Sequence, residues 1–370
     1  MISEDEQLKY RIALTLVPGI GSVLAKSLVS YCGSVENIFK RKKSQLEKIP
    51  GVGPERADAI VNHEVFERAE EEVKFIRKHK IKTFFYLDED YPARLKNCDD
   101  SPIMLFLKGN VDLNAARIIS IVGTRNITGY GKQVTEMFIE NFSKYNAVIV
   151  SGLAYGIDII AHKESLKQSL PTIGVLAHGL DRIYPSAHKP VAEKMIRNGG
   201  VLTEFISKTN PDRENFPSRN RIVAGMTDAT IVIESAIKGG ALITAEIANS
   251  YNRDVFAVPG KIGEKYSEGC HELIRMNKAM LVESADQVAE LLGWNDKPST
   301  KKENKQLKFF HELKGEEKVL VNILQQNGKM DIDTLTLVSK LNMSKVSSTL
   351  LNLEFAGVLR SLPGKVYELA

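Results

Sequence analysis

Cysteine is scarce in this chain, and long apolar runs are absent from it. The three cysteines, Cys32, Cys98 and Cys270, are scattered without paired spacing, which argues against a zinc site and against a disulfide framework. No apolar run approaches the ~20 residues that a membrane span needs, and the acidic residues 1–6 do not form a secretory signal. We therefore expect a cytoplasmic protein with no metal site and no membrane contact.

An excess of basic residues is also missing from most of the chain. The formal net charge is +4, from 50 Lys+Arg and 46 Asp+Glu in 370 residues. Residues 297–370 contain 12 basic and 8 acidic side chains, so residues 1–296 contain 38 of each and are neutral overall. Anion binding in the first 296 residues must therefore come from local geometry, because no general basic field exists there.

The chain is too long for a single hydrophobic core, and its patterns predict three folded parts. Residues 1–81 have the composition of a helical domain. Residues 82–294 alternate short Val/Ile-rich runs with amphipathic stretches, which is typical of an α/β domain with a mostly parallel sheet. The polar residues 295–315 predict a flexible linker, and residues 316–370 have an apolar periodicity of their own. The clearest expected strands are 118–122, 147–150, 172–176, 229–233 and 255–258.

The helical domain contains an internal repeat. Residues 17–21 and 49–53 both have the order apolar-Pro-Gly-apolar-Gly, and in each copy an alanine stands four residues after the second glycine. The repeat resembles a tandem pair of helix-hairpin-helix motifs of the SAM-like type. Such a turn leaves free N–H groups at the start of the next helix, and these can hold a DNA phosphate without reading a base. The alternative is that the hairpins serve only as packing units.

The C-terminal part predicts a winged helix. Its apolar spacing places helices near residues 318–324, 331–335 and 343–353, followed by a short β-ribbon over 358–369. The third helix would present serines and a single cation, Lys345, to its surroundings. A weak contact with double-stranded DNA and a protein-docking role are therefore equal alternatives.

The strand expected at 118–122 ends in a turn at Gly123, Thr124 and Arg125, just before an expected helix. This is the position of the phosphate-binding loop in Rossmann-like folds. The turn has neither the Gly-x-Gly-x-x-Gly nor the Walker A pattern, so we expect no dinucleotide or nucleoside triphosphate cofactor. Its backbone N–H groups and the guanidinium of Arg125 can hold a phosphate instead. The alternative for Arg125 is an ion pair with a neighbouring loop.

Small or basic residues follow the other strands as well. Gly152 comes after the second strand, where the backbone must pass close to another group. Gly239 and Gly240 open a helix that carries Thr244, and Lys261 follows the last strand. Because the carboxyl ends of parallel strands meet at one edge of a sheet, we expect these residues to converge on one ligand site.

Asp158 and His162 stand four residues apart on an expected helix, so they could share one face of it. No nucleophile stands beside them at a recognisable spacing. We therefore expect a hydrogen-bonded structural pair rather than an acid–base pair.

One short segment combines an aromatic, two arginines and an amide, which suits single-stranded nucleic acid; its residues are Phe216, Arg219, Asn220 and Arg221. A base can stack on Phe216 while one arginine reaches a phosphate, and Asn220 offers both a donor and an acceptor. The alternative is that Phe216 belongs to the core and that Arg221 pairs with an acid such as Glu204 or Glu234. We expect one arginine to be structural and the other to face the ligand.

Taken in order, the segments of the α/β domain resemble the DprA/Smf family of DNA-processing proteins. They include Ile-Val-Gly-Thr-Arg, Ser-Gly-Leu-Ala-Tyr-Gly-Ile-Asp, Gly-Leu-Asp-Arg-Ile-Tyr-Pro, Phe-Pro-Ser-Arg-Asn-Arg-Ile and Val-Pro-Gly. The resemblance covers the whole domain, and the hairpin pair and the C-terminal domain fit forms of the same family. It implies an extended Rossmann-like DNA-binding domain at 82–294.

The resemblance implies a protein that binds single-stranded DNA in a positively charged pocket, protects incoming DNA and loads the RecA recombinase onto it in natural transformation and homologous recombination. It also implies a homodimer formed through the Rossmann-like domain. The family's phosphate-binding turn falls on residues 123–125, its base-and-backbone segment on 216–221, and its glycine-rich helix start on Gly239, Gly240 and Thr244. One departure is Ser186, where many members carry a lysine, and it weakens the positive field expected there.

The alternative is an enzyme of a related Rossmann-like group, which cleaves the N-glycosidic bond of nucleoside monophosphates. Those enzymes resemble Pro-Gly-Gly-x-Gly-Thr-x-x-Glu at the glycine-rich turn. Here Lys238 replaces the proline, and Ile243 replaces the glycine before Thr244. The loop would carry a bulky side chain where the enzyme needs bare backbone, so we expect a binding protein rather than an enzyme.

Overall fold

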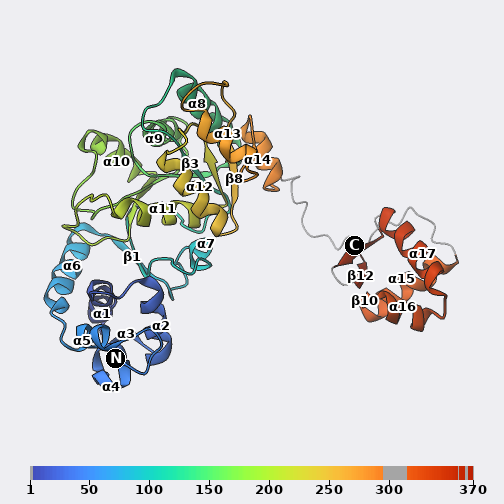
Figure 1. Cartoon of the computed structure of the whole chain (residues 1–370), viewed down its shortest axis with the longest axis horizontal. Coiled ribbons are helices and arrows are strands. Elements are labelled where there is room, and N and C mark those ends of the chain that lie inside the picture. Colours follow the sequence, from blue (N-terminus) through green and yellow to red (C-terminus); the bar gives the residue numbers. More distant parts are fainter. Residues whose placement is uncertain (1–2, 295–314, 357, 363–365, 370) are drawn as a thin grey trace. The chain divides into compact units, whose positions relative to one another are not determined.

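The computed structural model describes residues 3–294, 315–356, 358–362 and 366–369, which form two compact units (Figure 1). The first unit ends at Asn295, and the second begins at Asp296. The first contains the helical and the α/β parts of the sequence, and the second contains the C-terminal part. Almost all of the linker expected at 295–315 lies outside the described residues.

The first unit begins with a bundle of helices. They are α1 (Glu4–Leu16), α2 (Ser22–Cys32), α3 (Val35–Lys40), α4 (Lys43–Leu46), α5 (Pro54–Val61) and α6 (Val65–His79). Residues 17–21 join α1 to α2, and residues 49–53 join α4 to α5, so both copies of the repeat fold as a helix, a turn and a helix. Ile12, Leu28 and Ile60 are fully buried in the shared core of this bundle.

A nine-stranded sheet forms the centre of the first unit. The strands are β1 (Lys82–Phe85), β2 (Met104–Gly109), β3 (Ile118–Val122), β4 (Val148–Ser151), β5 (Thr172–Val175), β6 (Gly199–Thr203), β7 (Ala229–Val232), β8 (Asp254–Ala257) and β9 (Met280–Leu281). Their spatial order is β1-β2-β6-β5-β4-β3-β7-β8-β9. Neighbours from β6 to β9 pair in parallel, whereas β2 is antiparallel to β1 and β6. The expected α/β fold with a mostly parallel sheet is confirmed.

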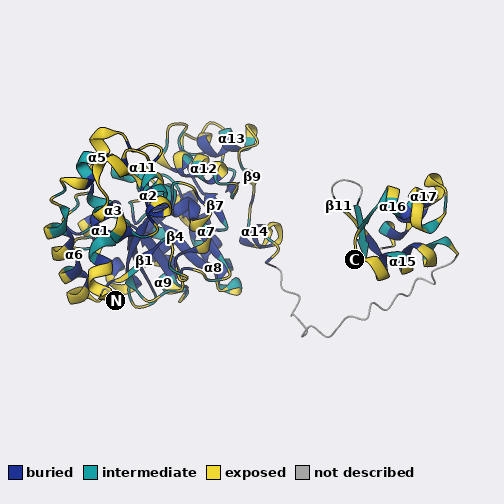
Figure 2. Ribbon diagram, turned by 90° about the horizontal axis from the view of Figure 1, so that it is seen from below, coloured by how far each residue is buried: buried dark blue, intermediate teal, exposed yellow. Residues whose placement is uncertain are grey.

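Helices cover both faces of this sheet, and the buried strands lie between them (Figure 2). One face carries α8 (Gly129–Phe142), α9 (Ile157–Lys167), α10 (Lys189–Met195) and α14 (Ala285–Leu291). The other carries α7 (Ala93–Lys96), α11 (Asn215–Gly225), α12 (Gly240–Ser250) and α13 (Glu268–Arg275). Short 3-10 turns follow α8 (Ser143–Tyr145) and precede α10 (Ser186–His188).

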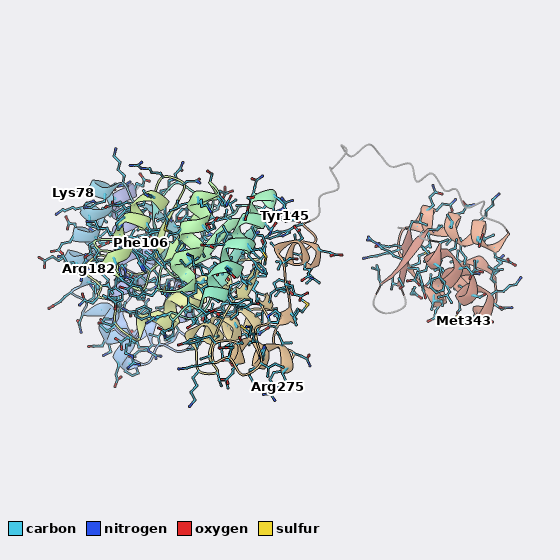
Figure 3. All side chains as sticks on the ribbon, turned by 90° about the horizontal axis from the view of Figure 1, so that it is seen from above. Lys78, Phe106, Tyr145, Arg182, Arg275 and Met343 are labelled. Atoms are coloured by element: carbon cyan, nitrogen blue, oxygen red, sulfur yellow. The ribbon has the colours of Figure 1, made fainter. Side chains whose placement is uncertain are left out.

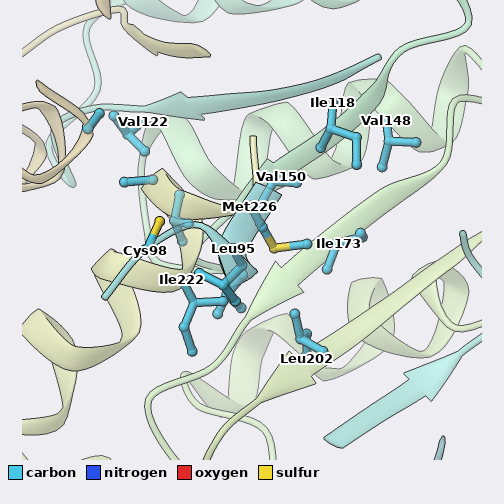
Figure 4. Packing of buried hydrophobic residues seen from close by; sticks show 14 of the residues in the cluster. Leu95, Cys98, Ile118, Val122, Val148, Val150, Ile173, Leu202, Ile222 and Met226 are labelled. Atoms are coloured by element: carbon cyan, nitrogen blue, oxygen red, sulfur yellow. The ribbon is translucent and has the colours of Figure 1, made fainter. Parts of the chain in front are cut away.

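Successive residues of β3 point to opposite faces of the sheet, as the pleat of a strand requires. Ile118 and Val122 belong to the core beneath α11 and α12, where Ile222 also packs (Figure 4). Ile119 and Ile121 belong to the core beneath α8 and α9. A run that is apolar except for the buried Ser120 therefore marks a strand that is buried on both faces.

The helical bundle packs directly on the first two strands. Phe85 of β1 and Phe106 of β2 join the core of the bundle, and Figure 3 labels Phe106. Glu72 of α6 is buried, and its carboxylate accepts hydrogen bonds from the Ser207 N–H (2.9 Å) and from Arg68 Nη2 (2.8 Å). These contacts make the bundle and the sheet one structural unit.

The second unit has the elements of the expected winged helix. They are α15 (Glu316–Asn327), β10 (Met330–Asp331), α16 (Ile332–Ser339), α17 (Met343–Phe355), β11 (Leu359–Leu362) and β12 (Val366–Leu369). The strands pair in the order β10-β12-β11. Leu320, Leu335 and Leu350, one from each helix, are fully buried in its core. The tip of the expected ribbon, at 363–365, lies outside the described residues.

Candidate nucleic-acid interface

The order of the sheet reverses beside β3. The chain runs outward from β3 through β4 and β5 to β6, and it then returns to place β7 on the other side of β3. In open α/β sheets, ligands bind at the carboxyl ends of the strands beside such a reversal. A cavity of about 590 Å³ lies there, lined by residues that follow β3, β4 and β7 and by residues of α11 and α12.

Most of the candidate residues from the sequence meet in this cavity. Its lining includes Gly123, Thr124, Arg125, Gly152, Phe216, Arg219, Asn220, Gly239, Gly240 and Thr244. It also includes Arg213, Lys265 and Tyr266, which no pattern in the sequence indicates. These three lie outside the helices and strands, where no periodicity predicts the direction of a side chain. The signal that could have identified Arg213 is its position three residues before Phe216.

The turn after β3 is fixed by hydrogen bonds to a buried acid, Glu234. The Thr124 N–H donates to the Glu234 carbonyl (2.8 Å), and the Thr128 N–H donates to the Glu234 carboxylate (3.1 Å). The Thr128 hydroxyl also donates to this carboxylate and accepts from the Gly131 N–H, which caps α8. The turn is therefore fixed before any ligand binds.

Arg125 projects from this turn toward Phe216. The guanidinium carbon of Arg125 lies 5.5 Å from the centroid of the Phe216 ring, and that of Arg219 lies 5.8 Å from it. Arg125 is exposed, and no carboxylate of the described residues lies within ion-pairing distance of it. The alternative of an ion pair with a neighbouring loop therefore finds no partner in the described part of the chain.

Arg219 forms part of the cavity floor and is 5% exposed. Its Nη1 donates to the Val175 carbonyl (2.7 Å), and its buried Nε has no hydrogen-bond partner. Burial lowers the pKa of Arg219, the charge of Asp158 opposes this shift, and the nearby Arg125 adds to it. The floor of the cavity thus holds a desolvated cation beside a second cation, an arrangement that favours an anionic ligand.

Arg221 lies on another side of α11 and does not line the cavity. Its guanidinium forms an ion pair with Glu204 and also donates to the Asp100 carbonyl. The pairing with Glu204, one of our two alternatives, is confirmed. Of the two arginines, Arg219 is the one at the cavity and Arg221 is the one held within the protein. Residues two apart on a helix do not share a face, which explains the difference.

The expected hydrogen bond between Asp158 and His162 is wrong. Asp158 accepts from the backbone N–H groups of Gly152 (3.1 Å) and Ala154 (3.3 Å), so it shapes the turn after β4. His162 Nδ1 instead bonds the Thr172 hydroxyl (2.7 Å). Burial lowers the pKa of His162 to about 3, with smaller effects of the same sign from nearby His188 and Arg219. Both side chains are structural, but Asp158 also lines the cavity.

Lys261 follows β8, as expected, but the structure does not bring it into the cavity. Its side chain is exposed on the loop after Pro259 and Gly260. The cation that this loop contributes to the lining is Lys265. The spacing from the strand end predicted the correct loop and the wrong lysine, because the loop continues for several residues before α13 begins.

Two basic residues beside the hairpins of the helical bundle have partners within the protein. Lys26 Nζ donates to the Asp99 carbonyl (2.8 Å) and to the Ser101 hydroxyl (2.7 Å). Lys43 forms an ion pair with Asp58 (2.8 Å). The turn at 17–21 contributes Ile20 and Gly21 to a second cavity of about 380 Å³ against the α/β part.

The exposed surface of α17 in the second unit is more apolar than basic. Met343, Leu351 and Phe355 are all exposed, and Phe355 is 83% exposed. Lys345 forms an ion pair with Glu316. This surface suits contact with another protein at least as well as contact with a phosphate backbone.

No group of three or more His, Cys, Asp or Glu side chains in the described residues could hold a metal ion. A search of the same residues also finds no helix that is both long enough and apolar enough to cross a membrane.

Family models match the three parts of the chain. Residues 82–293 match the model of DNA recombination-mediator protein A, residues 12–63 match a SAM-like helix-hairpin-helix tandem, and residues 311–365 match the DprA winged helix domain. The protein Smf of Synechocystis is 35% identical over 296 residues, which are 78% of this chain and 73% of that protein.

Two solved structures have the same fold. DNA processing protein A from Streptococcus pneumoniae has 32% sequence identity and a TM-score of 0.65, over 78% of this chain and 98% of that chain. DNA processing protein A from Helicobacter pylori, whose structure describes its single-stranded DNA binding mode, has 30% identity and a TM-score of 0.53. That match covers 58% of this chain and 95% of the other. This chain belongs to the DprA/Smf family of DNA recombination-mediator proteins.

Proposed function

We propose that this protein binds single-stranded DNA in the cavity beside β3, β4 and β7. The charge of the lining carries the proposal. In the described part of the chain, the basic residues of the lining are Arg125, Arg213, Arg219 and Lys265, and the one acid is Asp158. Asp158 is already engaged by two backbone N–H groups and by the charge of Arg219. The net local charge is therefore positive, although the first 296 residues are neutral overall.

Each part of the lining has a role in this proposal. The turn at Gly123 and Thr124 presents backbone N–H groups, and Arg125 can form two parallel hydrogen bonds with a phosphate. Phe216 offers a face on which any base can stack. Gly239 and Gly240 begin α12, whose N-terminal N–H groups favour an anion.

The remaining members of the proposed DNA site are Gly152, Arg219, Asn220 and Thr244, which also line the cavity. Asn220 can donate to and accept from a base edge. Arg221 and Lys261 lie outside the lining, so we leave them out of the proposed contacts.

The role in recombination extends this proposal. We infer that the bound strand is protected and then delivered to a RecA-type recombinase, in the cytoplasm, during natural transformation or homologous recombination. Membership of the DprA/Smf family supports this inference, as does the DNA-binding mode described for the Helicobacter pylori protein. Binding and delivery need no bond to be broken, so no catalytic group or cofactor is required.

The contacts of the glycine-rich turn do not favour the N-glycosidase alternative. The glutamate that follows the glycine-rich turn is Glu246, which forms an ion pair with Lys278 (3.3 Å) and does not line the cavity. Ile243 lines the cavity and is 45% exposed, where the enzyme would need bare backbone. Incubation with nucleoside monophosphates should therefore release no free base.

We also propose that two copies associate through the α/β part. β9 is the last strand of the sheet, and its Met280 and Leu281 are 43% and 48% exposed. Met276, just after α13, is 55% exposed nearby in the sequence. An exposed apolar edge strand is a ready surface for pairing with another chain. Light scattering should detect a dimer, and the double variant Met280→Glu, Leu281→Glu should be a monomer.

Three further assignments complete the proposal. Residues 82–294 form the DNA-binding domain, 295–315 link it to the rest, and 316–370 form a winged helix that docks on protein. We propose that the hairpins at 17–21 and 49–53 act mainly in packing. Weak binding of the winged helix to double-stranded DNA is the alternative to docking.

The deciding experiment measures the affinity of the full chain for single- and double-stranded DNA by fluorescence anisotropy. We expect tight binding to single strands and weak binding to duplexes at the same salt concentration. Adding a RecA-type recombinase and ATP to strands coated by a single-strand-binding protein should then give filaments faster with this protein than without it. Equal affinity for both DNA forms would contradict the proposed site. Unchanged filament formation would contradict delivery alone.

A further inference from the structure

Two half-exposed tyrosines lie on the carboxyl edge of the sheet, outside the cavity. Tyr155 follows β4 and is 52% exposed, and Tyr184 follows β5 and is 51% exposed. Neither residue belongs to the cavity lining. Exposed aromatic rings beside a ligand site are candidates for contact with the ligand, because a tyrosine ring offers a large apolar face.

Tyr155 is fixed beside the turn that carries Arg125. It lies in the turn whose Gly152 and Ala154 line the cavity. The Ile157 N–H donates to the Thr124 carbonyl (3.2 Å), which ties this turn to the turn after β3. A β-carbon at Gly156 would lie 2.1 Å from the Thr124 carbonyl oxygen, so the two backbones are in direct contact. The exposed ring of Tyr155 therefore lies directly beside the cavity, next to the lining residue Ala154.

The ring of Tyr155 rests on a buried histidine. The centroids of the Tyr155 and His188 rings are 4.7 Å apart, with an edge-to-face angle of 69°. His188 is 6% exposed, and its Nδ1 bonds the Leu153 carbonyl (2.8 Å). The ring is thus supported from the protein side, while half of its surface faces solvent. A supported aromatic ring loses little entropy when a second ring stacks on it.

Tyr184 continues the same edge toward β5. It lies four residues before His188, the residue that supports Tyr155, and its N–H donates to His178 Nε2 (3.2 Å). Lys189 follows His188, is exposed, and has no carboxylate of the described residues within ion-pairing distance. The short segment 184–189 therefore contains one accessible ring, the histidine that supports the ring of Tyr155, and one unpaired cation.

We propose that Tyr155 and Tyr184 form a stacking platform for the bases of a DNA strand that leaves the cavity, and that Lys189 contacts its backbone. This inference rests on the proposed function, because it extends the path of the same strand. Every base has a face that can stack on tyrosine, so the platform is independent of sequence. Paired bases in a duplex hide those faces. The platform therefore adds affinity for single strands only, and only for strands longer than the cavity holds.

The test compares a short and a long strand. For oligothymidylates of about 6 and about 20 nucleotides, Tyr155→Ala and Tyr184→Ala should each weaken the long complex about tenfold, which is the stacking contribution of one base. The short complex should be unchanged. Tyr31→Ala is the matched control, because Tyr31 is 59% exposed on α2 and should alter neither complex. Equal affinity of the wild type and both platform variants for the long strand would overturn the inference.

A second measurement separates stacking from other roles of the tyrosines. Tyr155→Phe keeps the ring and loses the hydroxyl, so it should retain the affinity of the wild type for the long strand. A loss as large as that of Tyr155→Ala would contradict stacking. A 2-aminopurine placed near one end of the strand should be quenched by the wild type and not by the double alanine variant. If the wild type binds no single strand at all, the proposed function itself fails. If the wild type does bind single strands and Arg125→Ala weakens this binding, the proposed function stands. The tyrosine variants then test the stacking platform alone.

Discussion

Arg219 lies directly against the backbone of Gly152. A β-carbon at Gly152 would be 1.9 Å from Arg219 Nη1 and 2.4 Å from the guanidinium carbon, so any larger residue at position 152 requires the Arg219 guanidinium to move. The close approach lets the buried guanidinium reach both the Val175 carbonyl and the field of Asp158. The absence of a side chain at position 152 thus leaves room for the Arg219 guanidinium at the cavity.

Gly152→Ala should therefore displace Arg219. Because the displaced side chain is charged and buried, we expect a loss of ~1–3 kcal/mol in the free energy of unfolding, as for other overpacked sites. Single-strand affinity should fall as well. Gly129→Ala is the control, since a β-carbon at Gly129 meets no atom within 4 Å, and it should change neither quantity. Chemical denaturation and anisotropy titration measure the two effects, and an unchanged affinity in the Gly152 variant would argue against Arg219 as part of the site.

Arg125→Ala should weaken single-strand binding by ~1.5–3 kcal/mol, the range for hydrogen bonds to charged groups. The loss should be the same for different base sequences, because phosphates carry no sequence information. Lys78→Ala removes one exposed positive charge from α6 and serves as the control (Figure 3). A folded Arg125 variant with the affinity of the wild type would show that Arg125 does not bind a DNA phosphate.

Phe216→Ala should cost ~1–3 kcal/mol of single-strand affinity if a base stacks on the ring. The slope of log affinity against log salt should hardly change, because stacking releases few counterions. A ring that serves only the core would instead appear as a large fall in melting temperature with little loss of affinity. Melting curves and binding curves recorded on the same variant distinguish the two outcomes.

Much of this site follows from the sequence because its residues come directly after strands. Most of the buried parallel strands are visible in the sequence as short apolar runs, and the residues after their carboxyl ends lie on the ligand edge of a parallel sheet. Gly123, Gly152 and Gly239 were placed in this way. β6 was not among the clearest strands, because it begins with two glycines and contains few apolar residues in a row.

The direction of a side chain within a helix or loop is less accessible from the sequence. Arg219 and Arg221 look alike in a sequence, yet the turn of α11 sends one to the cavity and the other to Glu204. Their roles depend on acids far away in the chain. Arg213 and Lys265 reach the cavity from irregular segments, whose path depends on packing that no local pattern encodes.

Acid should destabilise the protein through His162. Burial lowers the folded-state pKa of His162 from 6.5 to about 3, so below pH 6.5 the unfolded chain binds a proton that the folded chain excludes. The free energy of unfolding should therefore fall as the pH drops from 6.5 toward 3, by about 3 kcal/mol between pH 6.5 and 4.

His162→Leu tests this effect, because leucine fills the buried site without a titrating group. The variant should show a shallower dependence of unfolding free energy on pH in this window, whatever its stability at pH 8. Thr172 keeps its bond to the Ile149 carbonyl (3.0 Å), so its hydroxyl is not left without a partner. Equal slopes for the variant and the wild type would show that another group controls acid sensitivity.

Removal of residues 297–370 should leave a folded body that still binds single-stranded DNA. The first unit is compact without this segment, and its cavity uses none of the deleted residues. The deletion removes 12 basic and 8 acidic side chains and leaves 38 of each in residues 1–296. The slope of log affinity against log salt should stay close to that of the full chain if the winged helix docks on protein, because all four basic residues of the lining remain. A clearly shallower slope would show that cations of the deleted segment neutralise phosphates.

The effect of this truncation on duplex binding distinguishes the two roles of the winged helix. A helix that reads a groove needs basic and polar groups, but α17 exposes Met343, Leu351 and Phe355, and its Lys345 is paired with Glu316. We therefore expect the truncated protein to lose little affinity for duplexes and to lose its protein contacts instead. Phe355→Ser in the full chain should weaken the binding of the winged helix to its protein partner. The affinities for single-stranded and for double-stranded DNA should both stay unchanged. A large fall in duplex binding on truncation would assign the winged helix to DNA, and a complete loss of single-strand binding would mean that the cavity is not the DNA site.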